Sequence, residues 1–244
     1  MKSYFKLLLI FFFFSPFYLI TAQISQPEKQ YLMLYDNVIG LENTSLYNGV
    51  EYVEEYRTIN REHQFFPSRD FVEGNLQYDD EIFYDVFLKF DVYNNRLIAA
   101  LKSGNKETVL QLISEKVDWF QVYEKIFINV GSYENISGFL ELLAGSNTSG
   151  IYKQYVLDPI EMRDKQFVYY EFKPRDSRYY LLKDNQYFLV DSSKDFINVF
   201  PNEKERIRKF YKSNKNLLKA SRDQFMKKLY IELNGILMAK NNKI

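Results

Sequence analysis

Apolar and polar residues alternate through the middle of the chain, most clearly between residues 84 and 92. One face of this two-residue period carries Tyr84, Val86, Leu88, Phe90 and Val92, while Asp85, Phe87, Lys89, Asp91 and Tyr93 fall on the other. A period of two is typical of a β-strand that buries one face. We therefore predict a strand from Tyr84 to Val92.

A second strand is expected directly after it. Asn94-Asn95 supplies a turn that tolerates left-handed backbone angles. From Arg96 onwards, Leu97, Ala99 and Leu101 again fall on one face. This hairpin gives the sheet an apolar inner side. If the sheet holds a ligand, the residues expected to face it are Val86, Leu88, Phe90, Leu97 and Leu101.

Further short apolar runs follow one another with turn signals at intervals of about ten residues, which favours an antiparallel meander. Gaps this short leave no room for the crossover helices of a parallel sheet. The acidic triplet 79–81 is expected at a hairpin tip, because it lacks the full spacing of a calcium loop. The remaining runs are 74–78, 82–88, 109–113, 126–130, 139–143, 151–157, 167–172, 179–182 and 187–190.

The period changes after Asp191 from two residues to that of a helix. Ser192 or Ser193 can start a helical turn, and the pairs Asn202/Glu205 and Ser221/Gln224 resemble capping boxes. After Ser221, apolar residues recur at every fourth position, which predicts a helix that docks through one stripe. That stripe comprises Phe225, Leu229, Leu233 and Leu237.

These patterns predict an α+β protein, in which a curved, mainly antiparallel β-sheet or open barrel is followed by C-terminal α-helices. We assign residues 1–22 to a signal peptide, 23–190 to the β-rich domain and 191–244 to a helical segment packed on the sheet. Residues 23–46 show no decisive period.

The first residues have the three parts of a secretory signal. Lys2 and Lys6 form a cationic start, residues 7–19 are apolar except for Ser15 and Pro16, and Thr21-Ala22 offers a small-residue exit. The apolar core is shorter than the roughly 20 residues that a membrane span requires. We therefore expect cleavage near Ala22 and export to the periplasm, the cell surface or the medium.

Composition narrows the chemistry that the chain can support. There are no cysteines, which excludes disulfides, thiol nucleophiles and thiolate metal sites, and the single histidine, His63, removes most histidine-based acid–base and zinc chemistry. We expect His63 to be a packed or hydrogen-bonded imidazole at a strand end. The chain carries no nucleophile elbow, phosphate loop or dinucleotide motif. We therefore predict a non-enzyme without catalytic, cofactor-binding or metal-binding residues.

Charge is distributed unevenly, although the formal net charge is zero. Residues 23–130 contain eighteen acidic and ten basic side chains, whereas residues 202–228 contain three acidic and ten basic ones. A basic segment can bind nucleic acid or anionic membranes. We favour the solvated outer face of amphipathic helices, because exported proteins rarely meet nucleic acid, and we predict no nucleic-acid partner.

Four segments, 46–49, 63–66, 74–79 and 84–91, and a C-terminal stretch that begins at Asp195 share one pattern. This pattern resembles that of uncharacterised secreted or envelope proteins of Bacteroidetes. The match departs from the pattern at Asp80, where the family commonly has a turn glycine. The resemblance implies a secreted or envelope location, but it carries no activity and no site residues.

Two hypotheses for function follow. In the first, the protein is a non-enzymatic envelope protein that binds a partner or serves a structural role, with a filled sheet interior and an exposed patch. In the second, it is a carrier whose curved sheet holds an apolar, lipid-like ligand in a deep cavity. A hydrolase would need two carboxylates that converge in a cleft.

Overall fold

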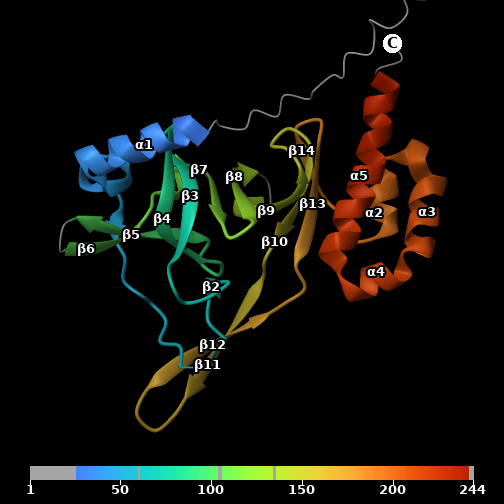
Figure 1. The fold of residues 1–244 in the computed structure, drawn as a ribbon. Helices are drawn as coiled ribbons and strands as arrows, with labels where there is room; N and C mark the ends of the chain where they lie inside the picture. The colour runs from blue at the N-terminus through green and yellow to red at the C-terminus, as the bar shows by residue number, and fades with distance from the viewer. Residues whose placement is uncertain (1–25, 60, 104–105, 134–135, 242–244) are drawn as a thin grey trace, which may run out of the picture.

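The computed structural model describes residues 26–59, 61–103, 106–133 and 136–241. The expected signal peptide, residues 1–22, lies outside these described residues. The described chain begins with helix α1 (Gln26–Ile39), which packs against the sheet over β4 (Figure 1). The ion pair between Lys29 and Asp85, at 3.1 Å, ties the helix to that strand.

One long antiparallel sheet forms the body of the protein, in the spatial order β1-β6-β5-β4-β3-β7-β8-β9-β10-β13-β14, with β2 paired to β4. Two hairpin series, β3 to β6 and β7 to β10, meet where β3 pairs with β7. The strands are β1 (Val50–Glu51), β2 (Phe65–Phe66), β3 (Val72–Tyr78), β4 (Glu81–Asp91), β5 (Arg96–Ser103), β6 (Lys106–Gln111), β7 (Val117–Val122), β8 (Lys125–Tyr133), β9 (Ile136–Gly145), β10 (Gly150–Gln154), β13 (Arg178–Lys183) and β14 (Gln186–Leu189).

The sheet is strongly curved but not closed. The Asn95 side chain in the β4–β5 turn bonds to the backbone of β9, although β3, β7 and β8 lie between β4 and β9 in the sheet. This contact requires the strands to curl towards one another. The prediction of a curved antiparallel sheet followed by C-terminal helices is therefore confirmed.

The predicted face of β4 is wrong at its first position. Asp85 has a left-handed φ of 54°, and the β3–β4 register slips between Gly74 and Leu76. This irregularity turns Phe83, instead of Tyr84, to the buried face that Val86 occupies. Tyr84 lies on the side of α1, where the Lys29 ammonium sits 5.1 Å from the centre of its ring. A left-handed aspartate in mid-strand leaves no mark in the apolar pattern.

The expected turns are present. Asp79 and Asp80 both have positive φ in the tip between β3 and β4, and Asn95 has a φ of 56° in the next turn. In β5, Leu97, Ala99 and Leu101 are all buried in the core, as the alternation predicts.

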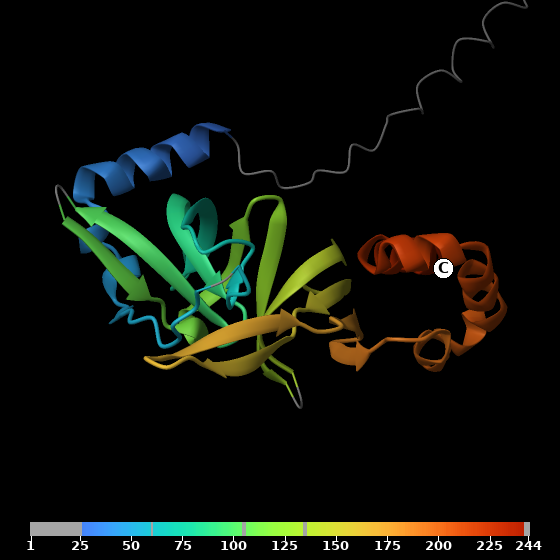
Figure 2. The ribbon, with the colours of Figure 1, turned by 90° about the horizontal axis from the view of Figure 1, so that it is seen from below.

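The C-terminal helices gather at one end of the sheet, beyond β10 and β13 (Figures 1 and 2). Their buried stripe includes Phe225, Leu229 and Leu233, as predicted, and it packs with Ile151 and Leu181 of the sheet. The Leu237 side chain lies outside the description. The helices are α2 (Ser193–Val199), α3 (Lys204–Ser213), α4 (Lys215–Ala220) and α5 (Arg222–Asn241).

The three expected helix starts differ in outcome. Of the two serines expected to start a helical turn, Ser192 caps α2, and it forms a complete capping box with Asp195. The box expected at Asn202 is wrong, because Pro201–Glu203 forms a short 3-10 turn that runs into α3 without a side-chain cap. At Ser221, the hydroxyl accepts a bond from the Gln224 backbone N–H at 3.3 Å.

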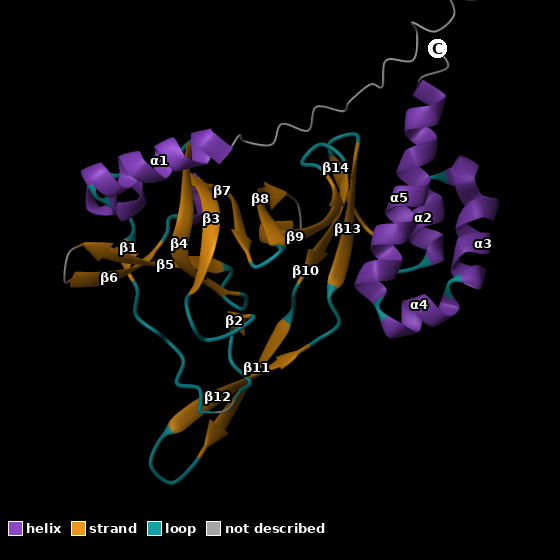
Figure 3. Cartoon of the chain, viewed as in Figure 1, coloured by secondary structure: helices purple, strands orange, loops and turns teal. Residues whose placement is uncertain are grey.

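A second, two-stranded sheet projects from the body as a hairpin (Figures 1 and 3). It consists of β11 (Leu157–Arg163) and β12 (Val168–Pro174). The sequence predicts β12 but not β11, which contains Pro159 and is almost entirely exposed, so it carries no alternation of burial. Helix α1 lies within residues 23–46, for which the sequence predicts no element.

Candidate functional site

The five residues expected to face a ligand lie in the main core. Their side chains are at most 3% exposed, and they share one apolar cluster. Aromatic rings fill the middle of that cluster: Phe120 stacks on Phe127 with ring centres 4.8 Å apart, and Phe90 lies 5.1 Å from each of them. Phe90 also lines a surface pocket. That the five residues Val86, Leu88, Phe90, Leu97 and Leu101 face a ligand stays a prediction.

A row of charged residues crosses the same face of the sheet as the core. Glu141 on β9 lies directly opposite Phe127 of the core on one side and Lys153 on the other. Lys153 in turn lies opposite Tyr179 on β13, and Ile151, two residues before it, packs under the helices. Paired residues of adjacent strands share a face. The row therefore separates the sheet core from the apolar cluster beneath the helices.

Hydrogen bonds and ion pairs tie this row together. The Lys125 ammonium lies 2.5 Å from the Glu141 carboxylate, and the Tyr155 hydroxyl donates to the same carboxylate at 2.5 Å. The Asp223 carboxylate at the start of α5 accepts from the Lys153 ammonium at 2.7 Å and from the Tyr179 hydroxyl at 2.6 Å. Sheet and helix are thus joined through two carboxylates, each shared by a lysine and a tyrosine.

The pKa shifts agree with the hydrogen bonds of this row. Burial and the hydrogen bond to Glu141 raise the pKa of the Tyr155 hydroxyl, and burial and Asp223 raise that of Tyr179. Burial acts to raise the pKa of Asp223, but its bonds from Lys153 and Tyr179 outweigh this and lower it. Both phenols therefore stay protonated donors at neutral pH. The arrangement holds the Tyr155 ring in one place.

Tyr155, just after β10, borders two surface pockets. The first, which we call the Arg178 pocket, has a volume of about 280 Å³. The second, which we call the Phe66 pocket, has a volume of about 460 Å³. Val92 and the segment 155–157 line both, so this segment forms the wall between them. We call the Tyr155 segment and its two pockets the Tyr155 surface.

The base of the Arg178 pocket is held by Asn95. Its side-chain amide donates to the Ser137 carbonyl at 3.2 Å, and its side-chain oxygen accepts from the Phe139 N–H at 3.0 Å. This close approach requires glycine at position 138, where φ is +79° and an added Cβ would lie 1.3 Å from the Asn95 amide nitrogen. The β4–β5 turn and β9 therefore meet at a fixed distance beneath the pocket.

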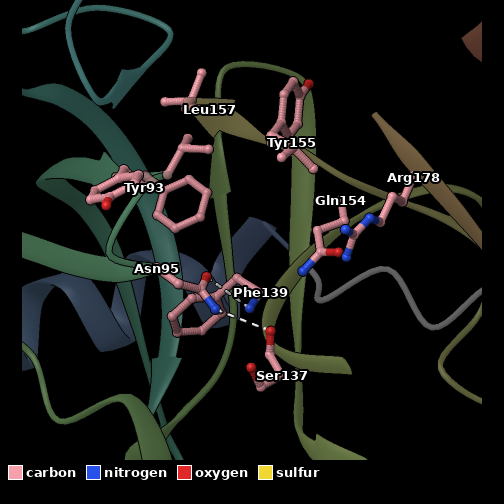
Figure 4. A pocket seen from close by; sticks show the side chains of 11 residues that line it. Tyr93, Asn95, Ser137, Phe139, Gln154, Tyr155, Leu157 and Arg178 are labelled. Carbon is pink, nitrogen blue, oxygen red and sulfur yellow. Dashed lines mark hydrogen bonds between the residues drawn. The ribbon is translucent and has the colours of Figure 1, made fainter. Parts of the chain in front are cut away.

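The walls of the Arg178 pocket differ in chemistry (Figure 4). Tyr93 and Phe139 lie on one side, and Gln154 and Arg178 on the other. The Gln154 side-chain oxygen accepts from the Tyr180 hydroxyl at 3.2 Å, which leaves its amide nitrogen to donate. Arg178 is exposed and makes no ion pair with a residue that the structure describes. The wall therefore presents a cation and an amide donor opposite aromatic rings.

The Phe66 pocket is more apolar. The Phe66 ring lies 5.0 Å from the Tyr155 ring, and Phe172 borders the pocket opposite. Charged side chains stand at the edge, where Arg175 pairs with Asp158 at 3.4 Å. The peptide bond between Phe66 and Pro67 is cis.

His63 also borders the Phe66 pocket, and its environment agrees with the expectation of a hydrogen-bonded imidazole at a strand end. Its Nδ1 accepts from the Phe65 N–H at 3.2 Å, at the start of β2. Burial lowers the pKa of the imidazole, assisted by the nearby Arg69. Within the described residues, no group of three His, Asp or Glu side chains gathers at metal-binding distance.

Sequence reasoning missed the central residues of this surface. Glu141, Tyr155 and Arg178 come from different strands or strand ends, and no fixed spacing connects them. The alternation on β9 predicts the face on which Glu141 lies, but a single sequence does not indicate that this face changes there from apolar to charged.

The fold and the site together define a class of protein. It is a curved, open antiparallel sheet that helices cover at one end, with two adjacent pockets at its strand ends. Comparisons of the chain with protein-family models, curated proteins and solved structures gave no match. None of the described helices has the length and apolar character needed to cross a membrane.

Proposed function

We propose that this chain is an exported, non-enzymatic envelope protein that acts by binding a partner, and that the partner docks on the Tyr155 surface. The N-terminal signal pattern and the resemblance to secreted Bacteroidetes proteins support export. The paired pockets, apolar on one side of Tyr155 and mixed on the other, support recognition. Binding surfaces commonly combine an apolar anchor with a polar rim.

One observation carries the proposal: the Tyr155 ring is fixed before any partner arrives. Its hydroxyl is held by Glu141, which is only 5% exposed, and its ring packs against Phe66. A side chain that is already immobilised loses little conformational entropy on binding. A half-exposed aromatic ring that is held from below by a buried carboxylate is thus well suited to recognition.

A carrier of an apolar, lipid-like ligand is the second candidate. The Phe66 pocket favours it, since it is large enough and apolar enough to accept part of such a molecule. The interlocked rings of Phe90, Phe120 and Phe127 argue against a ligand inside the sheet, because they occupy the space between its curled strands.

Site-specific photo-crosslinking in the native host tests the docking surface. A photoreactive residue at Ser177, on the border of the Phe66 pocket, is expected to give a discrete protein adduct. The matched control is Glu205, which is exposed on α3, far from the pockets in sequence and fold. Adducts that are identical at the two positions, or absent from both, contradict the proposal.

Native mass spectrometry of the protein from its own host tests export and the second candidate together. We expect a polypeptide that lacks residues 1–22 and carries no added lipid mass. A retained signal segment contradicts export, whereas a lipid that survives purification favours the carrier.

A further inference from the structure

The Arg178 pocket combines an unusual set of groups for a surface hollow of about 280 Å³. It is lined by one cationic side chain, by amides and hydroxyls, and by apolar and aromatic groups, and none of its lining residues is a carboxylate. Arg178 has no ion-pair partner in the described part of the chain. The pocket therefore carries an uncompensated positive charge.

The neighbouring Arg175 differs from Arg178 because it has an ion-pair partner. Arg175, three residues earlier on the border of the other pocket, pairs with Asp158. In the charged row, Lys125 and Lys153 are likewise neutralised by Glu141 and Asp223. Lys125, Lys153 and Arg175 thus each pair with a carboxylate, whereas Arg178 pairs with none among the described residues and is left for a ligand.

The hydrogen-bond donors at Arg178 and Gln154 determine which anion the pocket fits best. The Gln154 oxygen is occupied by the Tyr180 hydroxyl, so the amide presents its nitrogen, which Figure 4 shows turned towards the pocket. A planar guanidinium with an adjacent N–H donor matches the two oxygens of a carboxylate. A single positive charge also matches a single negative one.

The opposite wall fixes the rest of the ligand. Tyr93, Phe139 and Leu157 form an apolar surface across from the donors, and Phe90 also lines the pocket. A ligand that satisfies both walls has an anionic head and an apolar stem. The Asn95 side chain is held in place by the β9 backbone, which is bonded to its amide oxygen and to one of its two amide N–H groups.

We propose that the Arg178 pocket binds a carboxylate on a short apolar stem, held by Arg178 and Gln154 against Tyr93 and Phe139. This inference rests on the proposed binding function and names the chemistry that the surface recognises. Such a group occurs in free organic acids and at the C-terminus of a polypeptide that ends in an apolar residue.

Calorimetric titration of the signal-cleaved protein with phenylacetate and with phenylacetamide tests the chemistry. The two probes share a stem and differ in charge, so we expect the carboxylate to bind at least about tenfold more tightly, as hydrogen bonds between charged groups contribute this much or more. Equal binding of the two, or no binding of phenylacetate, overturns the proposal. Inorganic phosphate that binds as tightly as phenylacetate also overturns it.

Two variants locate the site. Arg178→Gln is expected to weaken phenylacetate binding about tenfold and to fold normally, because Arg178 is exposed and makes no ion pair with a described residue. Gln154→Glu keeps the acceptor for Tyr180 but places a second negative charge beside the ligand, so it should also weaken binding. The control Arg208→Gln, at an exposed arginine of α3 that lines neither pocket, should leave the affinity unchanged. An affinity that falls equally in Arg208→Gln and Arg178→Gln contradicts the assignment.

Two peptides distinguish the sources of the carboxylate. An acetylated tripeptide that ends in phenylalanine is compared with the same peptide carrying a C-terminal amide. Binding of the free acid, lost in Arg178→Gln, identifies a chain terminus as the ligand; binding of phenylacetate but of neither peptide identifies a small acid. A crosslinked partner at Ser177 without carboxylate binding would overturn this inference and leave the proposed function intact, whereas the reverse result would overturn partner docking.

Discussion

The two halves of the sheet cover the same face in different ways. The first half, from β6 to β9, curls over itself and packs phenylalanine against phenylalanine, with Phe120 and Phe127 stacked at the centre. The second half, β10 and β13, is covered by helices through Phe225 and its neighbours. The curled half is acidic and the helical layer basic, and the Lys125–Glu141–Lys153–Asp223 row runs between them. The charged groups, and the pockets beside them, thus lie at the boundary between the two halves of the sheet. We call this boundary the seam.

The sharpest way to break this comparison is to remove one ring from each half. Phe120→Ala and Phe225→Ala each empty a fully buried site, so each should lower the free energy of unfolding by about 4 kcal/mol. Strand β9 of the first half pairs with β10 of the second. We therefore expect each variant to unfold in urea in one cooperative transition, monitored by fluorescence and circular dichroism. Two separated transitions in either variant would show that the halves are independent units.

A smaller effect is expected where the curled half meets itself. Gly138→Ala introduces a Cβ against the Asn95 amide and a left-handed alanine, and should cost about 3 kcal/mol in unfolding free energy. In an Asn95→Ala background the clash is gone, so the same substitution should cost only the backbone strain, roughly 1–2 kcal/mol. A double-mutant cycle in urea measures the difference. Equal costs in the two backgrounds would contradict the contact.

The sequence predicts the main elements of both halves and misses two local features. Alternation at Val86, Leu88 and Phe90 gives the strand and its buried face, and the four-residue stripe from Phe225 gives the helical covering, because both patterns are local records of burial. The bulge at Asp85 is not predicted, because a left-handed residue within a strand leaves no mark in the apolar pattern. Strand β11 escapes because Pro159 and full exposure remove its signal.

The seam is the part that the sequence predicts least. Glu141 and Asp223 meet their lysines through strand register and helix docking, which only the assembled fold defines. Arg178 stands out because no described carboxylate pairs with it in the fold. A single sequence does not show which charged residues stay unpaired. The predicted export signal, by contrast, consists of consecutive residues, so its prediction requires no knowledge of the fold.

The seam itself can be weakened at Glu141. Glu141→Gln leaves Lys125 without its counter-ion and replaces a charge-assisted bond from Tyr155 by a neutral one, so the unfolding free energy should fall by about 2 kcal/mol. The control Glu205→Gln breaks an exposed pair with Arg208 one helical turn away and should cost under about 0.5 kcal/mol. Equal losses in urea denaturation would mean that the buried row adds no more than a surface pair.

The smallest expected effect is a change in pH dependence at Asp223, where the seam reaches the helices. Folding lowers the pKa of this carboxyl group from its ordinary 3.8. A carboxyl whose pKa is lowered on folding stabilises the folded state above its unfolded pKa, and that contribution disappears as the pH falls through the folded value. We therefore expect the wild-type protein to lose about 1 kcal/mol more than Asp223→Asn between pH 5 and pH 2, given typical charge-assisted hydrogen bonds.

Thermal unfolding of the two proteins across this range measures the difference. His63, whose pKa is lowered by burial and by Arg69, makes both proteins less stable as the pH falls below 6.5, because the unfolded chain takes up its proton first. That loss cancels when the two are compared. The two curves should stay a constant distance apart above pH 5 and approach each other as the pH falls towards 2. Parallel curves would mean that the helices dock through their apolar stripe alone, and that the lysine–aspartate bond across the seam contributes nothing to holding the two coverings together.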